Sequence, residues 1–229
     1  MFVRIIRSIV FATTLFCHSH VSIAFSNHDE VSNMMFEYRT NSDPVKLVQL
    51  MKYFDKNQLV YETSSSYSVI AFLSGAFHTH AGIGLDRWID FANGFDEPSK
   101  SAFLAAVNNS PDQLMSKMPV SPIQNEVMWG LYFSTGEEAF LEKLFSNVFL
   151  EGVKGDENAL NLEITRMSAR WSLATLSSKD EYVFRYLAKE RDYGVRGRRE
   201  VAEYLLKVNP ESIPGLFQTR IERLLKGGL

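Results

Sequence analysis

Apolar residues recur every three or four positions along most of the chain, which is the period of an amphipathic helix. No stretch alternates between apolar and polar residues over the length of a strand. The pattern therefore predicts an all-α fold. After a first helix that begins near Asp43, the predicted helical segments are 67–80, 85–95, 101–108, 110–118, 126–134, 137–149, 157–176, 181–190, 196–208 and 213–225.

Helix boundaries are marked by capping and helix-breaking residues. Asp43 followed by Pro44 is typical of a helix start, because Asp accepts hydrogen bonds from free amides and proline suits the first helical position. Pro119 and Pro122 indicate a boundary because proline removes a backbone donor. The segment 25–42, directly before Asp43, is polar and has no clear hydrophobic period, so we expect it to be a flexible lead-in to the first helix.

The second half of the sequence contains an internal repeat. Trp129 aligns with Trp171 at an offset of about 42 residues, which is the length of a two-helix solenoid repeat. The aligned pairs that follow are Leu131/Leu173, Glu138/Asp180, Phe140/Tyr182, Leu141/Val183 and Phe145/Leu187. We therefore expect residues 43–229 to form one domain of stacked antiparallel helix pairs, an α-solenoid similar to HEAT or tetratricopeptide arrays. Both tryptophans are expected in the core, with a ligand groove as the alternative.

The same region carries a short motif. Trp129-Gly-Leu-Tyr-Phe-Ser-Thr-Gly-Glu, followed later by Arg170-Trp-Ser-Leu, resembles a pattern in uncharacterised exported all-helical proteins of Gram-negative bacteria. The match covers about the central third of the chain. The resemblance implies an all-helical fold and a bacterial origin, and it implies no activity.

The first residues have the features of a secretory signal. Arg4 and Arg7 give a positive start, residues 8–16 are apolar, and Ser22-Ile23-Ala24 has the small residues that signal peptidase requires. We expect residues 1–24 to be a signal peptide cleaved after Ala24, with an uncleaved membrane anchor as the alternative. The predicted location is therefore the periplasm or the outside of the cell. Without the signal, no transmembrane segment is expected.

Composition narrows the possible functions. Cys17 is the single cysteine and lies within the predicted signal, so the mature chain would have neither disulfides nor thiolate chemistry. The formal net charge is -3, which argues against nucleic acid as a partner because phosphate binding requires a concentrated positive face. The 17 phenylalanines indicate large buried contacts between helices.

Two clusters have residue types that could support catalysis or metal binding. His78 and His80 are close in sequence, but residues at i and i+2 point in different directions on a helix, so we expect a helix-end pair and no metal site. Asp86 and Asp90 lie one turn apart and could serve as paired carboxylates, but without a marked cleft we expect them to form a solvated helix face. No phosphate loop, nucleophile elbow or cofactor motif occurs in the sequence.

Basic residues gather near the end of the chain. Arg196, Arg198, Arg199 and the nearby Tyr193 are the candidate binding residues, for a phosphate, an anionic lipid or an acidic partner. Acidic neighbours in the same stretch, such as Glu200, reduce its net charge.

The expected function follows from the fold and compartment together. We expect an exported, non-catalytic helical-repeat protein that binds another protein or a peptide, as a module of the bacterial envelope. No catalytic, cofactor or metal residue is predicted. The alternatives are an enzyme with a site near Asp86 and Asp90, and a secreted factor of the virulence type.

Overall fold

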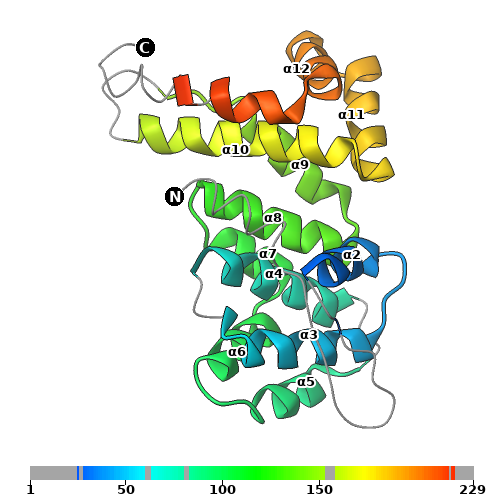
Figure 1. Cartoon of the computed structure of the whole chain (residues 1–229), viewed down its shortest axis with the longest axis vertical. Coiled ribbons are helices and arrows are strands. Elements are labelled where there is room, and N and C mark those ends of the chain that lie inside the picture. Colours follow the sequence, from blue (N-terminus) through cyan, green and yellow to red (C-terminus); the bar gives the residue numbers. More distant parts are fainter. Residues whose placement is uncertain are drawn as a thin grey trace. The chain divides into compact units, whose positions relative to one another are not determined.

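The computed structural model describes residues 25, 28–59, 63–79, 83–152, 158–216 and 218–219. Within these ranges all regular elements are helical, which confirms the predicted all-α class (Figure 1). The predicted signal peptide 1–24 lies outside the described residues, as do His80 and the end of the last predicted helix.

The helices form two compact units. Unit 1 contains Met1–Met118 and Glu126–Glu137, and unit 2 contains Pro119–Asn125 and Glu138–Leu229. One boundary between the units falls inside helix α8, Pro122–Thr135, whose residues 122–125 belong to unit 2 and whose residues 126–135 belong to unit 1.

Among its described residues, unit 1 contains the six helices α2 to α7 and most of α8. Within it, α4 packs against α5, α6 and α7, and α3 packs against α6. Capping residues define two of the helix starts: the Asp43 carboxylate accepts from the Val45 amide at 2.9 Å, and Ser110 forms a capping box with Gln113. The bounds are α2 His28–Tyr38, α3 Pro44–Lys56, α4 Thr63–Thr79, α5 Leu85–Ala92, α6 Ser99–Asn108, α7 Pro111–Ser116 and α8 Pro122–Thr135.

Helix α2 corrects the sequence prediction. The segment 25–42 was predicted to be a flexible lead-in, but residues 28–38 are helical. Val31, Met34, Met35 and Tyr38 are buried, and their spacing places them on one helical face. The prediction was wrong because the apolar stripe has only four buried residues, and the polar residues among them made the segment look polar as a whole.

Aromatic side chains make up much of the core of unit 1. The rings of Phe77 and Trp88 stack with centroids 4.5 Å apart, and those of Trp129 and Phe133 stack at 5.5 Å. Phe36 meets Phe133 edge to face at 4.5 Å. These contacts are the buried aromatic packing that the phenylalanine content predicts.

Two glycines allow helices α4 and α8 to approach closely. A Cβ atom at Gly130 would overlap the backbone oxygen of Ser68 and would lie 3.0 Å from the Phe72 amide nitrogen. A Cβ atom at Gly75 would overlap the Ser134 hydroxyl in the same way. Each helix therefore contributes a glycine where it meets the other.

Unit 2 is organised around α10, the long helix drawn in yellow in Figure 1. This helix packs against α9, α11 and α12, and α11 packs against α12. Asp180 caps α11 by accepting hydrogen bonds from the amides of Tyr182 and Val183. The bounds are α9 Glu138–Asn147, α10 Ala159–Ser177, α11 Glu181–Tyr193, α12 Arg196–Lys207 and η2 Pro210–Ser212, followed by helical residues 213–216 and 218–219.

The predicted repeat is only partly visible in the burial of its aligned residues. Leu131 and Leu173 are both buried, as are the pairs Leu141/Val183 and Phe145/Leu187, whereas Phe140 is buried and its counterpart Tyr182 is 51% exposed. Trp129 is buried, however, whereas Trp171 is half-buried, so the prediction of a core position was wrong for Trp171. The two tryptophans belong to different units and have different neighbours, which a period in the sequence does not specify.

Candidate functional site

The four predicted binding residues lie where α11 ends and α12 begins. Tyr193 is the last residue of α11, Gly194 caps that helix, and Val195 caps the start of α12. Tyr193 is 87% exposed and Val195 is 71% exposed. The connection therefore presents an aromatic and an aliphatic side chain to solvent, directly before the three arginines. We call this connection, residues 193–195, the apolar corner.

Arg198 points away from solvent into a cluster of polar side chains. Its Nη1 and Nη2 donate to the two carboxylate oxygens of Glu142 at 2.8 and 2.6 Å, and its Nε donates to Glu190 at 2.7 Å. The Tyr186 hydroxyl donates to Glu142 at 2.7 Å, and the guanidinium lies 4.7 Å from the centre of the Phe145 ring. These five residues, the Arg198 cluster, join α9, α11 and α12.

The Arg198 cluster shifts the acid–base equilibria of its members. Hydrogen bonding from Arg198 is the largest effect on Glu142 and lowers the pKa of that carboxyl below its ordinary value. Burial, followed by the hydrogen bond to Glu142, raises the pKa of the Tyr186 hydroxyl. The hydrogen bonds to Glu190 and Glu142 raise the pKa of the Arg198 guanidinium. The charged forms of Glu142 and Arg198 are thus favoured together.

The other two arginines remain on the surface. Arg196 donates to Glu200 at 2.9 Å, with both side chains well exposed. Arg199 is exposed, and no oppositely charged side chain pairs with it in the part of the chain that the structure describes. The three arginines therefore separate into one that holds helices together, one in a surface ion pair and one without a charged partner among the described residues.

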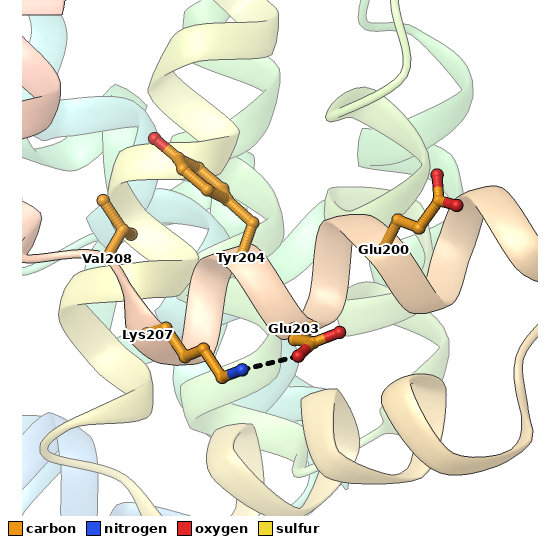
Figure 2. Close-up of a pocket in the computed structure, with 5 residues that line it drawn as sticks. All are labelled: Glu200, Glu203, Tyr204, Lys207 and Val208. Carbon is orange, nitrogen blue, oxygen red and sulfur yellow. Dashed lines mark hydrogen bonds and ion pairs between the residues drawn. The ribbon is translucent and has the colours of Figure 1, made fainter.

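An open groove of about 450 Å³ lies further along α12. Figure 2 shows Glu200, Tyr204 and Val208 projecting from one side of the helix, with the Glu203–Lys207 ion pair on the other side. These five residues line the groove. The hydrogen bond from Lys207 lowers the pKa of the Glu203 carboxyl. The groove offers a partly exposed phenol ring and an aliphatic side chain, bordered by charges that are already paired.

The residues considered for catalysis or metal binding are dispersed. The His78 ring forms a hydrogen bond of 3.1 Å with the Val107 carbonyl, which gives it a structural role at the end of α4. Asp86 and Asp90 are exposed on α5, and Trp88 between them turns into the core. No group of three or more metal-ligating side chains occurs within the described ranges.

Several polar side chains are buried in the cores of the two units, away from the apolar corner and the groove. In unit 2, Arg166 forms an ion pair of 2.5 Å with Glu163, and Asn147 donates to Asn125 at 2.8 Å. In unit 1, burial raises the pKa of the Glu126 carboxyl well above its ordinary value. Two buried atoms among these side chains, Arg166 Nε and Glu126 Oε2, have no hydrogen-bond partner, and none of these residues lines the groove on α12.

Sequence reasoning missed the groove and the Arg198 cluster. The spacing of Glu200, Tyr204 and Val208 at i, i+4 and i+8 is a signal for a shared helix face that could have been read. Glu142 lies 56 residues before Arg198, so no local pattern connects the two.

Comparison with known proteins gives no assignment for this surface. No family model matches the chain, no curated protein matches it, and no solved structure matches it. None of the described helices has both the length and the apolar character needed to cross a membrane. The function must therefore be argued from the described side chains.

Proposed function

We propose that the chain is an exported, non-catalytic protein that binds another protein or a peptide through the exposed surface of α11 and α12. This surface consists of the apolar corner, Arg199 and the groove on α12. The proposal places the protein in the bacterial envelope, in the periplasm or outside the cell, as the N-terminal sequence predicts.

The exposure of the apolar corner is the observation that carries the proposal. Tyr193 and Val195 are 87% and 71% exposed, although removing the apolar surface of either side chain from water is favourable. Tyrosine is also enriched at the centres of protein interfaces, where its ring packs and its hydroxyl forms hydrogen bonds. Tyr204, in the groove, adds a second exposed aromatic side chain on the adjoining helix.

The predicted repeat suggests why a binding surface would form on successive helices. We propose that the helix pairs stack as a solenoid in which α10 and α11 form one repeat and later helices add to it. Solenoids bind partners along surfaces formed by successive helices. In support, α10, α11 and α12 pack on one another, and Asp180 caps the turn between the first two.

Site-specific photocrosslinking in cells tests the binding proposal. A photoreactive amino acid at position 193 should give one reproducible protein adduct in a Gram-negative host. The matched control is position 185, which is also exposed and lies on α11, but outside the apolar corner. The expected result is an adduct from position 193 that disappears when Val195 is changed to Ser. No adduct from position 193, or equal adducts from both positions, would contradict binding through this corner.

Export is tested separately. The protein should be recovered from the periplasm or the medium, and its N-terminal residue should be Phe25 if cleavage follows Ala24. Recovery from the membrane with residues 1–24 intact would instead support the anchor alternative. Recovery from the cytoplasm alone would contradict export.

A further inference from the structure

Helix α8 is buried along most of its length. Residues 125–134 are ten consecutive buried positions, and Glu126 is the only one of them that carries a carboxyl group. Glu126 is 2% exposed, and its Oε2 has no hydrogen-bond partner. Because an ionised carboxylate is costly to bury without a partner, the packed structure favours the protonated, neutral form of Glu126.

Glu126 lies on the side of α8 that meets α4. Gly130 follows Glu126 by four residues, so the two lie on one face of the helix. At Gly130 the helices are in close contact, since a Cβ atom there would overlap the Ser68 backbone oxygen. The contact continues at Gly75, where a Cβ atom would overlap the Ser134 hydroxyl. The buried carboxyl group therefore adjoins a tight contact between two helices of unit 1.

No charged neighbour compensates the Glu126 carboxyl. The ionisable side chains around the α4–α8 contact come from α4, from α8 and from the end of α2: Tyr38, Arg39, Tyr67, His78 and Tyr132. Tyr67 is exposed, and His78 lies in the last turn of α4. The Arg39 guanidinium lies 4.9 Å from the centre of the Tyr132 ring, more than one turn beyond Glu126 along α8. None of these groups bonds to Glu126 Oε2, and burial raises the pKa of the carboxyl well above its ordinary value.

We propose that the α4–α8 contact is a pH-sensitive latch, which is closed while Glu126 is protonated and opens when Glu126 releases its proton to solvent. A change of rotamer cannot bring the carboxylate to water, because α8 is buried on all sides from residue 125 to residue 134. The part of α8 around Glu126 therefore has to separate from α4 before the charge can be hydrated. This latch in unit 1 is independent of the proposed binding surface on α11 and α12.

The direction of the pH effect follows from the state that binds the proton more tightly. The closed contact raises the pKa of Glu126 above its ordinary value of 4.5, so the closed state holds the proton more strongly than the open state. The latch is therefore strongest below pH 4.5 and weakens as the pH rises toward the pKa of the closed state. Within that window the equilibrium constant for opening should rise about tenfold for each pH unit.

Hydrogen–deuterium exchange of the purified full chain, followed by mass spectrometry at pH 5 and pH 8, tests the latch. After correction for the intrinsic effect of pH on exchange, the protection of segments 68–75 and 126–134 should fall at least about tenfold from pH 5 to pH 8. Segment 181–193 in unit 2 should keep its protection within about twofold. Glu126→Gln should remove the pH effect, whereas Glu137→Gln, at an exposed carboxyl just beyond α8, should leave it as in the wild type.

A second variant keeps the test decisive if glutamine is poorly tolerated in the core. Glu126→Met has a similar length and no ionisable group, so it should also remove the pH effect and should be at least as stable as the wild type at pH 8. An unchanged pH effect in either variant would overturn the latch, as would a Glu126→Met protein that circular dichroism shows to be unfolded at pH 8. An equal loss of protection in segment 181–193 would show a global destabilisation and would overturn it as well.

Discussion

The guanidinium of Arg198 and the carboxylate of Glu142 meet through two parallel hydrogen bonds, Nη1 to Oε1 at 2.8 Å and Nη2 to Oε2 at 2.6 Å. This bidentate pair connects α12 to α9, and Glu190 on α11 accepts a third bond from the same arginine. The position of the proposed binding surface therefore depends on a residue that takes no part in that surface itself.

Arg198→Lys should destabilise the protein by about 1–2 kcal/mol, because an ammonium group cannot reproduce the planar set of donors that reaches Glu142 and Glu190 together. Urea denaturation followed by circular dichroism measures this loss. Arg196→Lys is the matched control on the same helix and should leave the free energy of unfolding nearly unchanged, since its ion pair with Glu200 is well exposed. Equal effects of the two substitutions would show that the Arg198 cluster adds nothing to stability.

The lowered pKa of Glu142 predicts a dependence of stability on pH. A carboxyl whose pKa is lower in the folded than in the unfolded state contributes stability above its ordinary value of 4.5 and loses that contribution as the pH falls through the folded value. Glu142→Gln should therefore be less stable than the wild type at pH 7, and the difference should narrow below about pH 4.5. Urea denaturation of both proteins from pH 7 to pH 3 provides the comparison. A difference that stays constant over this range would contradict the assignment.

Gly130→Ala should destabilise unit 1 by about 1–3 kcal/mol, because the added methyl group meets the Ser68 backbone oxygen, which cannot rotate away. The matched control is Gly197→Ala on α12, where a Cβ atom has no neighbour within 4 Å. That substitution should be neutral or stabilising by up to about 1 kcal/mol, since alanine favours a helix over glycine. Thermal unfolding of the two variants measures the contrast, and a destabilised Gly197→Ala would show that the helix propensity argument fails there.

Trp129→Ala should cost about 3–5 kcal/mol, as expected for a large side chain removed from a packed core. Trp171→Ala should cost less than half as much, because Trp171 already contacts solvent on one side. Denaturation curves for the two variants test the difference. Equal losses would mean that Trp171 is as well packed as Trp129 and would restore the equivalence that the repeat predicts.

Local sequence signals predicted most helices correctly. Asp43 and Ser110 both cap helices where the sequence places their starts, because capping depends on residues within one turn. Helix α2 was missed because its apolar stripe is short and because polar residues lie between the apolar ones in the sequence. The division into two units was not predicted, since it depends on contacts between distant segments and no local pattern encodes those contacts.

The sequence predicted which residues lie at the candidate site, but not how their side chains are arranged there. Tyr193 and the three arginines do lie close together in the chain, at one helix connection. The sequence could not distinguish Arg198 from Arg199, because their roles differ through a carboxylate 56 residues away. Adjacent residues on a helix point in different directions, so one of the two turns inward while its neighbour remains in solvent.

The interleaving of the two units has a consequence for synthesis on the ribosome. Unit 1 requires residues 126–137 as well as its first segment, whereas residues 119–125, which belong to unit 2, leave the ribosome in between. The first unit is therefore complete only when residue 137 has emerged, and by then residues 119–125 of the second unit have already left the ribosome. A nascent chain halted before residue 126 would lack the glycine that lets α8 seat against α4.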